Sequence, residues 1–189
     1  MVKDPEAVST RMPTPAPTPH LVSPPAGSRI LAALPGADFA DAWAVAAAEP
    51  GLSALGQFLK AARATPAWVE ACMRLRNRVV RWFGLKDLGG LSDLDPQRPL
   101  QDYRPGDRVG IFTLLENHPD EVLLGDRDRH LEVVLSVHTT GGEAATQSGP
   151  AVVTITTVVH VHNLLGRLYM LPVAPMHRRI APAVLRALG

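Results

Sequence analysis

The chain has 189 residues, which suits one domain and leaves little room for a second. Hydrophobic residues make up 46% of the sequence, enough for a buried core, and 19 Lys and Arg nearly balance 18 Asp and Glu. This balance gives no electrostatic reason to expect binding of nucleic acid or of an anionic membrane.

The only cysteine is Cys72, so no intramolecular disulfide can form. The first residues lack the apolar segment of a secretory signal. The most hydrophobic stretch near them, residues 30–48, is interrupted by Pro35, Gly36, Asp38 and Asp41 and does not suit a membrane span. We therefore expect a cytoplasmic protein.

Residues 1–29 contain seven prolines and no Phe, Trp or Tyr. Such a segment buries too little apolar area to offset the entropy lost on ordering. The sequence predicts a disordered, Pro-rich tail over residues 1–29 and a single domain over residues 30–189.

The first predicted elements of the domain are a strand and two helices. Alternating residues from Phe39 to Val45 indicate a short strand. Helical spacing predicts helices over residues 52–64 and 66–83, the second with Thr65 as its N-cap. One apolar stripe of the second helix consists of Trp68, Cys72, Leu75, Val79 and Trp82. A long loop over residues 85–107 then leads to a predicted strand over residues 108–115.

The second half is predicted to be mostly strands. Two longer strands, over residues 127–138 and 151–162, form an antiparallel pair. A turn over residues 163–166 precedes a predicted strand over residues 167–173 and a terminal helix over residues 175–188, which Pro182 should kink. Because helices are segregated from a run of strands, the fold class is α+β, an antiparallel sheet packed on helices.

Each of the two long strands has an apolar and a polar face. The apolar sets are Leu131, Val133, Leu135 and Val137, and Val153, Ile155, Val159 and Val161. The polar sets are Asp128, His130, Glu132, Ser136 and His138, and Thr154, Thr156, His160 and His162. If the apolar faces coincide, the polar faces coincide too, and one register places His130 opposite His160 and Asp128 opposite His162.

Such a cluster of imidazoles and carboxylates suits two kinds of chemistry. Two His at positions i and i+2 could bind a divalent metal together with a carboxylate. A His beside a carboxylate could instead act as a general base. The alternative, which the pattern favours over a metal site, is the solvent face of an antiparallel sheet. We predict no metal and, because the nucleotide-binding and redox motifs are absent, no cofactor.

Between residues 75 and 177 the chain carries a series of short motifs. They are Leu75-Arg76-Asn77, Trp82-Phe83-Gly84-Leu85, Leu124-Gly125, Asp128-Arg129-His130-Leu131, Thr157-Val158-Val159-His160, His162-Asn163, Gly166, Tyr169, Pro175 and His177. In this order they resemble a bacterial family, domain of unknown function 2867, over roughly residues 37–188. The resemblance implies a START-like (SRPBCC), helix-grip fold, in which an antiparallel sheet curls around a C-terminal helix and leaves an apolar ligand cavity.

The resemblance also marks candidate site residues, namely Arg76, Asn77, Asp128, His130, His160, His162, Asn163, Tyr169 and His177. Each has a structural alternative: Arg76 and Asn77 could tie a helix to the sheet, Asn163 could supply a turn, and Tyr169 could belong to the core. The predicted domain has fewer strands and a shorter terminal helix than the helix-grip fold. Some relatives look fused to nicotinamide-binding domains, so the resemblance implies a separate redox partner here.

Three hypotheses follow for the function. The first is a module that binds a small hydrophobic ligand between the sheet and the helices. The second is an enzyme in which His130, His160 or His162 acts as a base or a metal ligand, with these side chains within hydrogen-bond reach of one another. The third is an interaction domain, such as a homodimer formed through the sheet.

Overall fold

A seven-stranded antiparallel sheet forms the centre of the computed structural model, which describes residues 18–82, 90–141 and 151–189. Its strand order is β1-β2-β7-β6-β5-β4-β3. The strands are β1 (His20–Leu21), β2 (Phe39–Ala46), β3 (Arg108–Val109), β4 (Phe112–Asn117), β5 (Glu121–Arg127), β6 (Leu131–Thr140) and β7 (Val152–Val161). The α+β class predicted from the sequence is confirmed.

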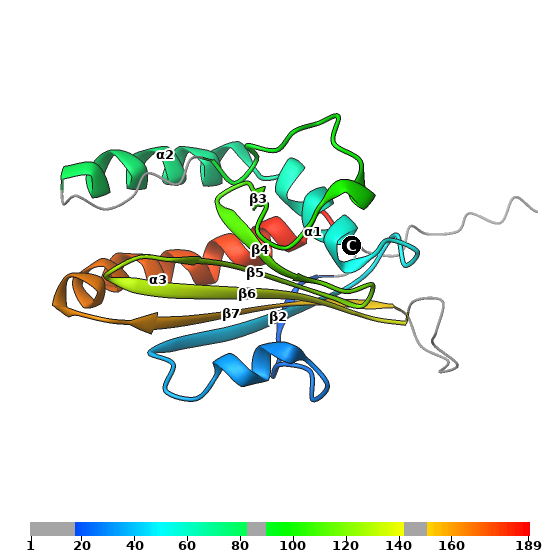
Figure 1. Cartoon of the computed structure of the whole chain (residues 1–189), viewed down its shortest axis with the longest axis horizontal. Coiled ribbons are helices and arrows are strands. Elements are labelled where there is room, and N and C mark those ends of the chain that lie inside the picture. The colour runs from blue at the N-terminus through cyan, green and yellow to red at the C-terminus, as the bar shows by residue number, and fades with distance from the viewer. Residues whose placement is uncertain (1–17, 83–89, 142–150) are drawn as a thin grey trace, which may run out of the picture.

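The helices lie on both sides of this sheet (Figure 1). One side carries α1 (Ala54–Arg63), α2 (Ala67–Trp82) and the long C-terminal helix α3 (Leu164–Leu185). The other side carries the short 3-10 helix η1 (Arg29–Ala33), and a second 3-10 turn, η2 (Leu100–Asp102), precedes β3. Of the described helices, none combines the length and the apolar character that crossing a bilayer requires.

The main core lies between the sheet, α1 and α3. Alternate residues of the central strands, such as Leu124, Val137 and Val153, are fully buried there. They pack against Leu55 of α1 and Leu185 of α3, which are also buried. Each such side chain contributes about 1.5–3 kcal/mol to stability when it is fully removed from water. The predicted apolar faces of β6 and β7 are therefore confirmed for this part of the sheet.

The central strand β5 was not predicted. Its apolar residues Val122, Leu123 and Leu124 are consecutive and all buried. Val122 and Leu124 belong to the main core, whereas Leu123 packs on Ile30 of η1 on the opposite side of the sheet. Because both faces of this strand are covered, it lacks the polar and apolar alternation by which the other strands were recognised.

The end of the chain is one helix, so the predicted strand over residues 167–173 is wrong. Helix α3 begins after Asn163, whose side-chain oxygen accepts a hydrogen bond from the Gly166 N–H, and it contains Pro172, Pro175 and Pro182. Proline inside a helix leaves the carbonyl four residues earlier without its N–H donor. Those carbonyls belong to exposed residues, where water can bind them; they are Leu168, Leu171 and Arg178. The helix therefore continues through all three prolines.

The segment before η1 lies against the sheet, although the sequence predicted disorder up to residue 29. His20 and Leu21 pair with Ala44 and Trp43 of β2, and Ser28 caps η1 by accepting from the Ile30 N–H. Ordering is favourable here because backbone groups are hydrogen-bonded to the sheet edge. Residues 1–17 lie outside the described part of the chain.

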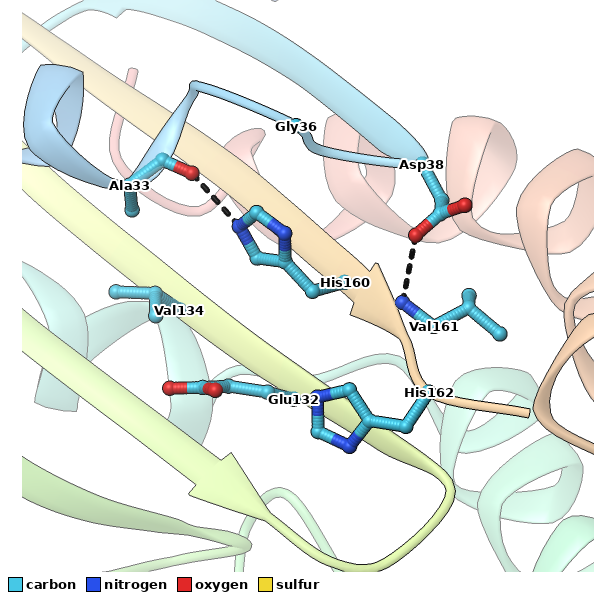
Figure 2. Close-up of a pocket in the computed structure, with 8 residues that line it drawn as sticks. All are labelled: Ala33, Gly36, Asp38, Glu132, Val134, His160, Val161 and His162. Carbon is cyan, nitrogen blue, oxygen red and sulfur yellow. Dashed lines mark hydrogen bonds between the residues drawn. The ribbon is translucent and has the colours of Figure 1, made fainter.

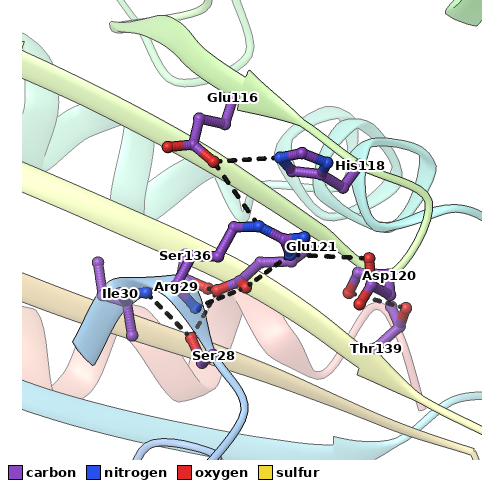
Figure 3. A network of polar contacts seen from close by, with 9 residues as sticks. All are labelled: Ser28, Arg29, Ile30, Glu116, His118, Asp120, Glu121, Ser136 and Thr139. Carbon is purple, nitrogen blue, oxygen red and sulfur yellow. Dashed lines mark hydrogen bonds and ion pairs between the residues drawn. The ribbon is translucent and has the colours of Figure 1, made fainter. Parts of the chain in front are cut away.

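A buried carboxylate, Glu121 of β5, joins this segment to the sheet (Figure 3). Its side chain is 0% exposed and accepts hydrogen bonds from the Ser28 hydroxyl at 2.5 Å, the Ser136 hydroxyl at 2.6 Å and the Arg29 backbone N–H at 2.8 Å. The Arg29 guanidinium lies 3.5 Å from the same carboxylate. The negative charge is thus fully satisfied by groups of η1 and β6.

Candidate functional site

A cavity of about 460 Å³ lies between one face of the sheet and the three α-helices. The sheet side of its wall comes mainly from β6 and β7, where residues such as Leu131, Val133 and Val159 face the helices. The helix side is also mainly apolar and includes Phe58, Ala61, Val69, Met73, Met170, Val173 and Ile180. The cavity therefore adjoins the core, and Leu135 and Ile155 of the sheet belong to both.

Helix α2 forms one wall of the cavity, and Cys72 and Leu75 of the predicted apolar stripe line it. Val69 is 0% exposed, and Cys72 is half-buried and lines the cavity. In contrast, Trp68 is 44% exposed and Leu75 is 63% exposed, so the stripe is not covered along its whole length. The side chains of Val79 and Trp82 fall outside the described part. An apolar stripe fixes the buried face only when a helix packs closely, and α2 borders a cavity instead.

Three predicted site residues meet where α2 approaches α3. The Arg76 Nε donates to the Tyr169 hydroxyl oxygen at 3.0 Å, and its Nη1 donates to the Asn77 Oδ1 at 2.8 Å. The guanidinium carbon lies 5.6 Å from the centre of the Tyr169 ring, within range of a cation–π attraction. Arg76 and Tyr169 both line the cavity.

A second polar pair at the cavity joins α3 to β2. The His177 Nε2 lies 3.1 Å from the Asp41 Oδ1, and the other Asp41 oxygen accepts a hydrogen bond from the Trp43 Nε1 at 3.2 Å. The Asp41 side chain is 7% exposed and that of His177 is 24% exposed. Asp41 was missed as a site residue, although a carboxylate between Phe39 and Trp43 on the inward face of a strand was a usable signal.

His130 and Asn163 have structural roles instead. The Nε2 of the buried His130 accepts a hydrogen bond from the Arg129 Nε at 2.7 Å, so its Nδ1 carries the proton of the neutral ring and donates to the Asn163 Oδ1 at 3.1 Å. Asn163 also donates to the Arg129 carbonyl. Both ring nitrogens are occupied, and the group fastens the β5–β6 turn to the start of α3.

Asp128 occupies the same turn and also lines the cavity. Its Oδ1 accepts hydrogen bonds from the backbone N–H groups of His130 and Leu131 at 2.6 Å and 3.0 Å. The carboxylate therefore closes the turn from β5 into β6. This role explains the position of the residue without any ligand.

The predicted register of β6 and β7 is wrong by two residues. His160 pairs with Glu132, Leu131 pairs with Val161, and the His162 N–H donates to the His130 carbonyl at 2.8 Å. Within the paired strands, an even shift keeps each side chain on its predicted face but changes its partner. The alternation of polar and apolar residues alone therefore could not reveal the two-residue error in register.

The two other histidines of the predicted cluster, His160 and His162, lie on the opposite face of the sheet from the cavity, beside η1 (Figure 2). His160 is bonded through Nε2 to the Ala33 carbonyl oxygen at 2.8 Å, and the exposed His162 lies near Glu132. Both border an open hollow of about 430 Å³ that also includes Asp38 and Val134. The predicted cluster is thus divided between the two faces, and among the described residues no group of three His, Cys, Asp or Glu could hold a metal ion.

A family model described as "Protein of unknown function (DUF2867)" matches residues 33–184. The chain belongs to this family. The DUF2867 match extends from the end of η1 to the last turn of α3 and so includes both walls of the cavity. No curated protein and no solved structure matched the chain. The family resemblance of the sequence motifs is confirmed. Because the family has no described function, a function is inferred from the geometry of the cavity.

Proposed function

We propose that this DUF2867 protein binds a small apolar ligand in the cavity between the sheet and the helices. The observation that carries the proposal is the cavity itself, about 460 Å³ with mainly apolar walls from all three α-helices. This volume lies within the usual range of ligand sites in proteins, about 300–1,000 Å³. Empty apolar walls lose dispersion contacts, which an apolar ligand would restore.

The same proposal assigns the fold to the START-like, helix-grip class. In support, the long helix α3 lies on one side of an antiparallel sheet, and residues of both line the cavity. If each non-hydrogen atom takes about the 30 Å³ of a liquid water molecule, the cavity accommodates about fifteen such atoms. A bacterial origin, a cytoplasmic location, a homodimer and a separate redox partner stay predictions from the sequence.

Filling the cavity from α2 tests the proposal. Cys72→Phe places a ring in the cavity, and Ala71→Phe adds the same ring at the neighbouring exposed position. We expect the neutral fluorescent probe phenylnaphthylamine to bind the wild type and Ala71→Phe equally, with one site per chain. Cys72→Phe should weaken binding at least tenfold, because the ring occupies the volume of the ligand. Equal binding by all three proteins would place the probe on the outer surface and contradict the proposal.

A second candidate function is an enzyme that moves a proton on a small hydrophobic substrate. The pairing of His177 with the nearly buried Asp41 favours it, since a carboxylate that orients a histidine is a common arrangement for a general base. His177 lines the cavity, whereas the histidines first considered, His130, His160 and His162, do not.

Deuterium exchange tests this second function without knowledge of the substrate. In D₂O, a general base in the cavity should speed exchange of the protons next to the carbonyl of octan-2-one, followed by NMR. His177→Gln should reduce the rate to that of buffer. The matched control is His118→Gln, because His118 pairs with Glu116 at the same 3.1 Å outside the cavity. A wild-type rate equal to that of buffer would rule out a general base acting on this ketone.

A further inference from the structure

In the described part of the chain, the contact between α2 and α3 leaves hydrogen-bond donors without acceptors at the cavity wall. A guanidinium has five N–H donors and no acceptor. Arg76 uses its Nε on Tyr169 and one Nη1 hydrogen on Asn77. Within the described part of the chain, the other three N–H groups of Arg76 have no hydrogen-bond acceptor.

Tyr169 adds a further donor at the same place. Its hydroxyl oxygen accepts the hydrogen bond from Arg76, so its own hydrogen points elsewhere. No acceptor for this hydrogen is found in residues 18–82, 90–141 and 151–189. Because both side chains line the cavity, donors from α2 and α3 converge on its interior.

The described residues around Arg76 also leave its charge unbalanced. Among the described residues, no carboxylate lies within 4 Å of its guanidinium. Two acids line the same cavity, but Asp126 pairs with Arg108 at 3.3 Å and Asp128 accepts two backbone N–H groups. A partly buried cation beside apolar walls gains more from an anionic partner than an exposed one does.

We propose that the ligand of this cavity carries a carboxylate head group, bound by Arg76 and Tyr169, with its apolar body along β6, β7 and α3. A single guanidinium fork matches the planar carboxylate and balances its one negative charge. Asn77 acts as a positioning residue, because its side-chain oxygen holds the Arg76 Nη1. This inference rests on the proposed binding function and names the class of ligand.

The test compares three probes with one alkyl chain and different head groups: octanoate, n-octanol and octylamine. Isothermal titration calorimetry at pH 7 measures the Kd of each for the wild type and two variants. Arg76→Gln removes the charge at the cavity, and Arg74→Gln removes the same charge from an exposed position of the same helix. We expect the wild type to bind octanoate about tenfold more tightly than n-octanol, which corresponds to about 1.4 kcal/mol.

Arg76→Gln should abolish this preference and leave the Kd of n-octanol unchanged, whereas Arg74→Gln should retain it. Tyr169→Phe, which keeps the ring, should weaken octanoate binding several-fold and gives a second readout if Arg76→Gln folds poorly. Equal binding of octanoate and n-octanol by the wild type would overturn the carboxylate inference while the binding function stands. Tightest binding of octylamine would overturn it in favour of Asp126 and Asp128, and no binding of any probe would contradict both proposals.

Discussion

At the scale of single residues, the pKa of Glu121 shows that hydrogen bonds can outweigh the effect of burial. Burial raises the pKa of this carboxyl group, but the hydrogen bonds from the Arg29 backbone N–H and the Ser136 and Ser28 hydroxyls hold the pKa below its ordinary value. A carboxyl group with a lower pKa in the folded state stabilises the fold at pH values above its unfolded pKa of about 4.5. This stabilisation is lost as the pH falls through the folded-state pKa.

We therefore predict that Glu121→Gln lowers the free energy of unfolding by about 2 kcal/mol at pH 7, because the amide presents two N–H groups to neighbours that are themselves donors. Urea denaturation followed by circular dichroism measures this change. As the pH falls below about 4.5, the wild type should lose more stability than the variant. Asp120→Asn is the control, since this neighbour also approaches Arg29, at 3.9 Å, but is 60% exposed. A loss equal to that of Asp120→Asn would contradict the assigned role of Glu121.

The sequence indicated some site residues and missed others for identifiable reasons. Arg76, Asn77, Tyr169 and His177 were predicted through the family resemblance, and the structure places all four at or beside the cavity. Asp41 was missed because its partner His177 lies 136 residues away in the chain. Long-range pairing of this kind follows from the topology, which residue patterns do not contain.

At the scale of elements, the start of α3 depends on close packing at Gly166. A Cβ atom at this position would clash with the His130 carbonyl oxygen and would lie 2.9 Å from the Val161 Cγ1. The carbonyl is fixed because it accepts the His162 N–H at 2.8 Å. The absence of a side chain at residue 166 thus lets α3 begin directly against the β5–β6 turn.

We predict that Gly166→Ala destabilises the protein by about 1–3 kcal/mol, as overpacking usually does. Alanine favours helix over glycine by about 1 kcal/mol, but here the clash is with backbone that cannot move away, so the net effect is a loss. Thermal unfolding followed by circular dichroism measures it. Gly51→Ala, where a Cβ atom meets nothing within 4 Å, should leave Tm nearly unchanged. A Tm of Gly166→Ala at or above that of the wild type would show that the turn can yield.

Elements with alternating or helical periodicity were predicted well, and the others were not. The strand from Phe39 and the helices α1 and α2 lie within a few residues of their predicted bounds. The predicted strand over residues 108–115 is divided into β3 and β4 by Gly110, whose φ is 58°. β5 was not predicted because both its faces are buried. The terminal helix was predicted only from residue 175, because the prolines of α3 resemble breaks. For each element that was predicted wrongly, tertiary contacts or solvent exposure outweighed the local residue pattern.

At the scale of the whole molecule, the α+β class followed from the order of elements, but the cavity did not. The sequence indicated apolar faces on the sheet and the helices, which suit either a packed core or a cavity. The position of α2 decides between them, and no residue pattern fixes how far a helix stands from a sheet. The volume between them is therefore a property of the assembled fold.

The edge strands of the sheet have a consequence for association between copies of the protein. The outermost strands, β1 and β3, have two residues each, so neither of them offers a long row of unpaired backbone groups. Strand addition by a neighbouring copy needs a longer row of such groups. Short outermost strands of this kind reduce edge-to-edge aggregation, which matters for a protein whose interior is partly unfilled.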